Sequence, residues 1–142
     1  MNRYLLIDDD DIIQFIHRKV ISAVDPEADV SAVFSADKGL EALLNWDSEL
    51  LPDFIFIDIS MPVKTGFDLL DVLMSEHPAL HDGLMSKSRV FLLTSSVNPR
   101  DLDRAKAFPL IERMLSKPLT PELMKQLQAV SPKAPLRHEG TA

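Results

Sequence analysis

Residues 54–58 read Phe-Ile-Phe-Ile-Asp, an uninterrupted apolar run that ends in a carboxylate. Residues 4–7 (Tyr-Leu-Leu-Ile) have the same form before two aspartates, and residues 90–93 (Val-Phe-Leu-Leu) have it before a threonine. Because these runs are rich in branched and aromatic residues and lack polar alternation, they predict strands buried on both faces of a parallel sheet. Weaker strand candidates lie at residues 29–34 and 112–116.

Helices are expected between these strands. Apolar residues recur every three or four positions along residues 13–24, which predicts a helix with one apolar stripe. Shorter helices are expected over residues 37–46 and from a capping-box pattern at residues 65–68. Two more should begin at the cap-and-proline pairs Asn98-Pro99 and Thr120-Pro121.

The alternation of strands and helices predicts an α/β fold, a doubly wound five-stranded parallel sheet flanked by five helices. The helix that starts after Asn98 is expected to run to about Phe108, where Pro109 stops it. Residues 78–87 contain a proline and a glycine and are expected to form a long loop.

The 142-residue chain fits one domain, expected over residues 1–130, with residues 131–142 as a flexible tail. It has no cysteine, which excludes disulfides and thiolate sites. Its net charge of −7 argues against binding to nucleic acid or to an anionic membrane surface. No apolar run approaches the ~20 residues of a membrane span, and no signal peptide is recognisable, so a cytoplasmic location is expected.

Polar residues follow the predicted strands where a doubly wound sheet binds its ligands. They are Asp8, Asp9, Asp58, Thr94 and Lys117. Clustered carboxylates repel one another unless a cation joins them, and Mg²⁺ suits such oxygen ligands. An aspartate can also be a nucleophile that forms an aspartyl phosphate. Phosphoryl transfer then needs charge neutralisation, which an ammonium and a hydroxyl can supply.

Four segments resemble the receiver domains of two-component response regulators, and the likeness extends over about residues 3–130. The segments are Leu5–Asp10, Phe56–Pro62, Leu92–Ser95 and Leu115–Thr120. Each segment alone is weakly specific, but four in this order are specific to the family. The resemblance implies a flavodoxin-like fold with strand order 2-1-3-4-5. It also implies a cis bond between Lys117 and Pro118.

The resemblance assigns a role to each candidate residue. Asp58 would accept the phosphoryl group, and Lys117 and Thr94 would assist it. Mg²⁺ would be bound by Asp8, Asp9, Asp58 and the backbone carbonyl of Ser60. Thr94 and Ser95 would belong to the switch, together with Met114. In this family an aromatic residue is common at the position of Met114, so the methionine marks a departure from the usual switch.

The resemblance further implies a stand-alone response regulator that is not an enzyme beyond slow autodephosphorylation. A histidine kinase or a histidine phosphotransfer protein would donate the phosphoryl group. Because no further module follows Val130, output is expected through a downstream protein partner, with the chain a monomer or a phosphorylation-dependent dimer.

Two alternatives stay open. One is a degenerate receiver that acts as a phosphorylation-independent scaffold. The other is a Mg²⁺-dependent phosphohydrolase that resembles the haloacid dehalogenases, but these enzymes need a second aspartate where this chain has Ser60.

Other polar residues receive simpler interpretations. Asp10 and Asp11 are expected to cap the first helix and complement its dipole rather than bind metal. The histidines are expected on exposed helix faces, in the loop and in the tail, without function; they are His17, His77, His81 and His138.

Overall fold

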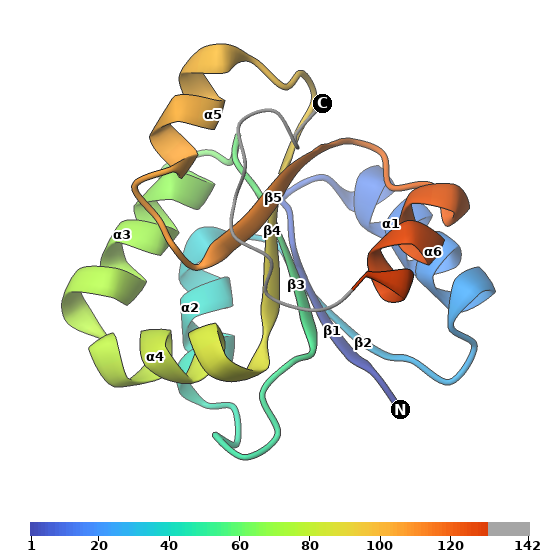
Figure 1. Ribbon diagram of the computed structural model, residues 1–142, viewed down its shortest axis with the longest axis horizontal. Coiled ribbons are helices and arrows are strands. Elements are labelled where there is room, and N and C mark those ends of the chain that lie inside the picture. The colour runs from blue at the N-terminus through green and yellow to red at the C-terminus, as the bar shows by residue number, and fades with distance from the viewer. Residues whose placement is uncertain (131–142) are drawn as a thin grey trace.

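The computed structural model describes residues 1–130 and contains one five-stranded parallel sheet. The strand order β2-β1-β3-β4-β5 confirms the predicted one. The strands are β1 (Arg3–Ile7), β2 (Asp29–Val33), β3 (Phe54–Asp58), β4 (Arg89–Thr94) and β5 (Ile111–Ser116). Their carboxyl ends all meet at one edge, the upper edge in Figure 1. The predicted tail, with His138, lies outside the described residues.

Helices cover both faces of the sheet, which confirms the doubly wound arrangement. They are α1 (Asp11–Val24), α2 (Ala36–Leu44), α3 (Gly66–Glu76), α4 (Pro78–Lys87), α5 (Pro99–Ala105) and α6 (Pro121–Ala129). Figure 1 shows α1 and α6 on one face, and the other four helices on the opposite face. No helix within residues 1–130 is both long enough and apolar enough to cross a membrane.

The loop predicted over residues 78–87 is wrong, because this segment forms helix α4 and brings the described helices to six rather than five. Pro78 lies in the first turn, where a helix does not need its N–H. Leu84 is fully buried in the core. Its burial offsets the cost of about 1 kcal/mol for Gly83 inside a helix. His81, expected in a loop, is also buried in this helix.

One helix end also differs from the prediction. Helix α5 ends at Ala105 rather than near Phe108. Phe108 instead turns into the core, where its ring lies 6.0 Å from that of Phe67 on α3. The burial of the Phe108 side chain is therefore favoured over continuation of the helix, which ends at Ala105, before Pro109.

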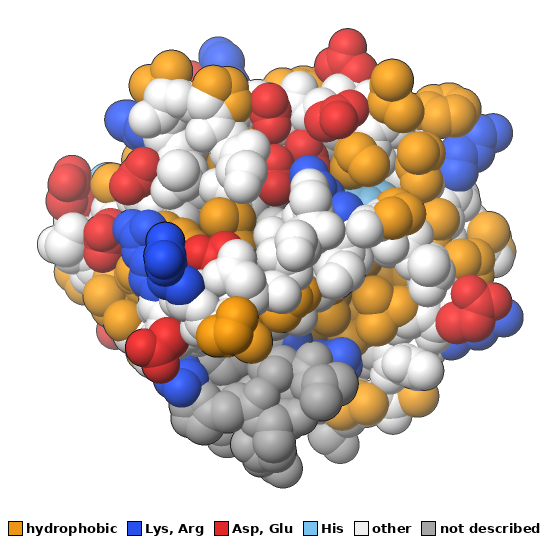
Figure 2. Space-filling view, turned by 90° about the horizontal axis from the view of Figure 1, so that it is seen from above, with side chains coloured by type: hydrophobic (Ala, Val, Ile, Leu, Met, Phe, Trp, Pro, Cys, Tyr) orange, Lys and Arg blue, Asp and Glu red, His pale blue; other side chains and the backbone are white. Residues whose placement is uncertain are grey.

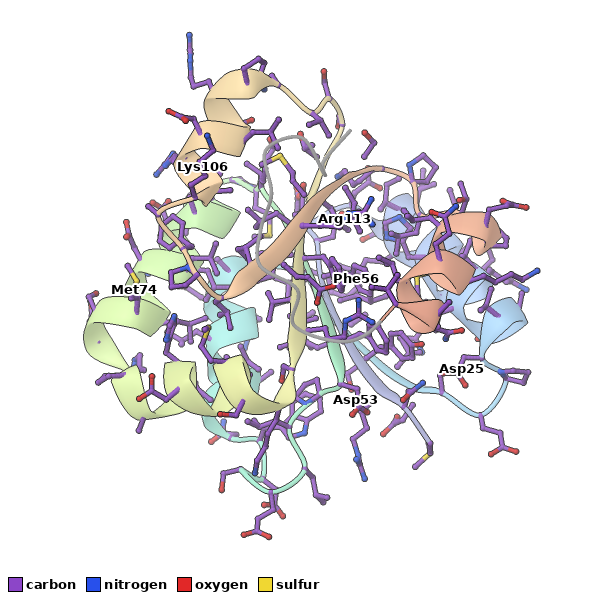
Figure 3. The ribbon with its side chains drawn as sticks, viewed as in Figure 1. Asp25, Asp53, Phe56, Met74, Lys106 and Arg113 are labelled. Carbon is purple, nitrogen blue, oxygen red and sulfur yellow. The ribbon has the colours of Figure 1, made fainter. Side chains whose placement is uncertain are left out.

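The apolar strand runs are buried on both faces because successive side chains point to opposite sides. Leu5 and Ile57 belong to the core under α2, α3, α4 and α5. Tyr4 and Phe56 belong to the second core, under α1 and α6. Figure 3 shows Phe56 on this second side, and its ring lies 5.2 Å from that of Phe91 on the neighbouring strand. Two apolar layers thus hold the strands from both sides and fix the edge where they end.

Proline and alanine at position 83 should differ strongly in their effect on stability, because α4 is a helix. Proline removes an N–H and clashes with the preceding turn, which costs about 3 kcal/mol relative to alanine. The alanine Cβ would meet Leu51 Cδ1 at 3.3 Å, a side-chain end that can move. Urea unfolding of Gly83→Pro and Gly83→Ala measures the difference. A difference below about 1 kcal/mol would mean that the segment is not a stable helix.

Candidate functional site

Three aspartate side chains converge where β1 and β3 end. Asp8 and Asp9 follow β1, Asp58 is the last residue of β3, and the two strands are adjacent and parallel. One carboxylate oxygen of each residue lies within 4.8 Å of the other two. Asp8 and Asp58 are buried, whereas Asp9 is exposed. Figure 2 looks down onto this edge and shows acidic side chains gathered beside basic ones near the middle of the face.

Lys117 brings a positive charge to this cluster from the end of β5. Its Nζ lies 3.2 Å from Asp8 Oδ2 and 3.2 Å from Asp58 Oδ1. Burial lowers the pKa of Lys117, but the two carboxylates outweigh burial and raise the pKa above its usual value. The lysine therefore stays charged and bridges the two aspartates. Its peptide bond to Pro118 is cis, as the resemblance implied.

The cluster carries more negative than positive charge. Burial, and then the Asp8 carboxylate, raise the pKa of Asp58 to about 6, although Lys117 and the N–H of Ser60 oppose this shift. A carboxylate that is costly to ionise favours a neighbouring cation. Oxygen atoms from three carboxylates form a donor set that suits Mg²⁺. The residues present therefore fit a Mg²⁺ site.

Backbone N–H groups hold the two buried carboxylates in place. The N–H of Asp10 donates to Asp8 Oδ1 at 3.0 Å, and the N–H of Ser60 donates to Asp58 Oδ1 at 3.2 Å. The Asp10 side chain accepts from two N–H groups in the first turn of α1, which confirms its predicted capping role. Asp11 is the first residue of that helix, where a negative charge complements the dipole.

The start of α3 packs directly against the strand that ends in Asp58. The N–H of Gly66 donates to the carbonyl of Ile59 at 3.0 Å. A Cβ on Gly66 would lie 2.6 Å from the carbonyl oxygen of Asp58. Because that neighbour is backbone, no side-chain rotation can relieve the contact, and only glycine fits. This close approach fixes the backbone of Asp58.

The residues expected to form the switch lie in different surroundings. Thr94 is buried at the end of β4, where its hydroxyl donates to the carbonyl of Ser96 and accepts from the Ser96 N–H, both at 3.2 Å. Ser95 is exposed in the loop that follows. Met114 pairs with Leu92 in the sheet and is buried in the apolar core.

Two polar residues on α1 are buried, which the sequence did not predict. His17 was expected to be exposed, but only 1% of it is exposed, and its Nε2 accepts a hydrogen bond from the Leu119 N–H at 3.0 Å. Gln14, one turn earlier, donates to the carbonyl of Asp8 at 3.1 Å. The fully buried positions of α1 are Gln14, His17 and Ile21, whereas Val20 and Val24 of the predicted apolar stripe are partly buried and pack against the same core. The spacing of the fully buried positions is helical, but an apolar pattern cannot reveal polar members of a buried face.

Comparisons with known proteins agree with this geometry. The sequence pattern of the response regulator receiver domain matches residues 4–129. Over 79 residues the chain is 35% identical to chemotaxis protein CheY from Listeria monocytogenes, which covers 56% of this chain and 62% of that protein. The match thus spans less than two thirds of that relative.

Solved structures show the same fold. A two-component response regulator from Cytophaga hutchinsonii has a TM-score of 0.79 at 31% identity, covering 91% of this chain and 95% of that one. Chemotaxis protein CheY4 from Vibrio cholerae has a TM-score of 0.69 at 26% identity, covering 92% and 99% of the two chains.

Asp58→Asn should stabilise the metal-free protein at pH 8. The pKa of Asp58 rises from 3.8 to about 6 on folding, so the ionised carboxylate destabilises the folded state above pH 6 and the penalty vanishes below about pH 4. We expect a gain of about 1–3 kcal/mol at pH 8 that fades as the pH falls to 4. Urea unfolding in EDTA measures it, with the exposed Asp9→Asn as the control. An equal gain at both pH values would contradict this reading.

Proposed function

Because the chain belongs to the response regulator receiver family, we propose that it is a signalling switch that accepts a phosphoryl group on Asp58. We take residues 1–130 as the receiver domain and place it in the cytoplasm, where phosphodonor proteins act. The observation that supports this most is the buried Asp58 carboxylate, which shares the Lys117 ammonium with the Asp8 carboxylate. The role is that of a phospho-acceptor and not of an enzyme that turns over a substrate.

The Asp58 carboxylate acts as the nucleophile in this proposal. Its Oδ1 already accepts from the Ser60 N–H and lies against the Lys117 ammonium, so we assign the attack to Oδ2. A bond forms between Oδ2 and phosphorus while the bond from phosphorus to the donor atom breaks, and the donor takes up the proton it needs from water. Lys117 can pair with a phosphoryl oxygen because it lies beside the acceptor and stays charged.

Asp8, Asp9 and Asp58 would hold Mg²⁺, together with the backbone carbonyl of Ser60. When bound, the ion neutralises the carboxylates and the negative charge of the transferred group. Without such a cation, the raised pKa of Asp58 shows how strongly burial and Asp8 disfavour a further negative charge.

Thr94 is the proposed link from chemistry to output. Its hydroxyl must leave its contacts with Ser96 to reach a phosphoryl oxygen, so phosphorylation would rearrange the loop between β4 and α5. Ser95 lies in that loop, and the flexible side chain of Met114 fills the core next to β4 in place of an aromatic ring. A downstream partner, or a second copy of the chain in a phosphorylation-dependent dimer, would recognise the rearranged surface.

The phosphodonor is proposed to be a histidine kinase or a histidine phosphotransfer protein that docks on α1. Ile12 and Phe15 on this helix are 71% and 62% exposed, directly after the acidic cluster in sequence. Lys19 lies 5.5 Å from the centre of the Phe15 ring and adds a positive charge to this apolar surface. A donor must approach Asp58 from this edge, so the exposed side chains lie where it would make contact.

Incubation with acetyl phosphate and Mg²⁺ should add one phosphoryl group to the chain. Intact mass spectrometry should detect the adduct in the wild type and in Asp11→Asn, whose carboxylate lies outside the cluster. The adduct should disappear in Asp58→Asn and when EDTA is added. If the folded wild type shows no adduct and binds no beryllofluoride, a scaffold role replaces the switch. Repeated turnover of a small phosphate ester would instead favour a phosphohydrolase.

Phe15→Ala should slow phosphotransfer from a protein donor and leave acetyl phosphate chemistry unchanged. Loss of a central aromatic contact typically weakens an interface by more than about tenfold. The donor used is the phosphorylated histidine kinase domain that reacts fastest with the wild type. Leu50→Ala is the matched control, because Leu50 is also exposed but precedes β3 at the opposite edge of the sheet. Equal slowing by both variants would contradict the proposal that the phosphodonor docks on α1.

A further inference from the structure

A buried hydrogen bond joins α1 to the loop that carries Lys117. His17 on α1 accepts from the N–H of Leu119 at 3.0 Å, and the two residues are 102 positions apart in the chain. Both residues are 1% exposed. Water therefore cannot replace the acceptor at this position, and loss of His17 would leave a buried N–H without a partner.

This bond limits the movement of Lys117. On one side of the lysine side chain, the Lys117 N–H donates to the Thr94 carbonyl at 2.8 Å. On the other side, Pro118 has no N–H, so Leu119 supplies the next backbone donor. The loop is thus attached to β4 at Lys117 itself and to α1 two residues later, at Leu119.

The protonation state of His17 suits this role. An imidazole accepts through Nε2 only when that nitrogen carries no proton, so the ring is neutral with its proton on Nδ1. Burial, and then the nearby charge of Lys117, lower the pKa of His17 to about 4. The acceptor is therefore present throughout the neutral range.

The same face of α1 also holds the backbone of Asp8, one of the two carboxylate partners of Lys117. Gln14 lies one turn before His17 and donates to the carbonyls of Leu6, Asp8 and Val33. One helix therefore fixes the backbone of Asp8 through Gln14 and the loop after Lys117 through His17. The distance between the ammonium and the carboxylate depends on this shared support.

We infer that His17 is a positioning residue, which holds the Lys117 loop so that the ammonium stays beside Asp8 and Asp58. Its role is mechanical, since its ring contacts neither carboxylate in the hydrogen bonds described. The inference rests on the proposed function only for its kinetic consequence, because the position of Lys117 can be measured without any phosphoryl transfer.

Three variants separate positioning from packing. His17→Leu keeps a side chain of similar size but removes the acceptor. His17→Gln places an amide oxygen near the position of Nε2 and should restore it. Ile21→Val is the matched control, because Ile21 is fully buried one turn further along the same face of α1 and has no polar atom.

The first readout is the rate of phosphorylation by acetyl phosphate at saturating Mg²⁺. We expect His17→Leu to be about tenfold slower because the ammonium is displaced from the reacting group, a change that corresponds to about 1.4 kcal/mol in the activation free energy. His17→Gln should recover most of the rate. Ile21→Val should lower the melting temperature without slowing the reaction. Wild-type rates in His17→Leu, or equal slowing in Ile21→Val, would overturn the inference.

The second readout is the crystal structure of His17→Leu. Lys117 Nζ should move away from at least one of its carboxylates, each of which lies 3.2 Å from it in the wild type. Unchanged distances would overturn the inference. If the wild type accepts no phosphoryl group at all, the proposal for Asp58 fails, and the position of Lys117 still decides the role of His17.

Discussion

Two buried carboxylates share one ammonium at the carboxyl edge of the sheet, so negative charge exceeds positive charge there. The surrounding backbone contacts keep these three groups close together. Asp8 and Asp58 are brought together by adjacent parallel strands, and each accepts a backbone N–H. Lys117 reaches both from β5. Gly66 lets α3 lie directly against the backbone of Asp58, so this strand end is closely packed. Such a site is held ready for additional positive charge.

Much of this could be predicted from the sequence, because the relevant signals are local. Apolar runs without polar alternation mark strands buried on both faces, and the carboxyl ends of parallel strands must meet. Knowledge of the strand ends therefore places Asp8, Asp9 and Asp58 at one edge of the sheet, and the strand order implied by the resemblance makes their strands neighbours there. The cap formed by Asp10 is also local, since its partners are N–H groups in the next turn.

The features that escaped prediction depend on residues far apart in the chain. Proline and glycine within residues 78–87 indicate a loop when read locally, and only the burial of Leu84 makes a helix there favourable. His17 stands between Ile16 and Arg18 in the sequence, and its partner Leu119 is separated from it by most of the chain. A polar residue on a buried helix face gives no periodic signal of its own, so the predicted stripe included the partly buried Val20 and Val24 but not the buried Gln14 and His17.

Helix α1 reverses the usual amphipathic order near its start, with Ile12 and Phe15 outside and Gln14 and His17 inside. The two faces therefore meet different physical requirements. Outer side chains contribute little to the core, so exchanging them should change what docks on the helix more than the stability of the fold. The inner pair cannot drift in the same way, because each member satisfies backbone groups that no water can reach. A single helix can thereby acquire new specificity while the chemistry beneath it stays the same.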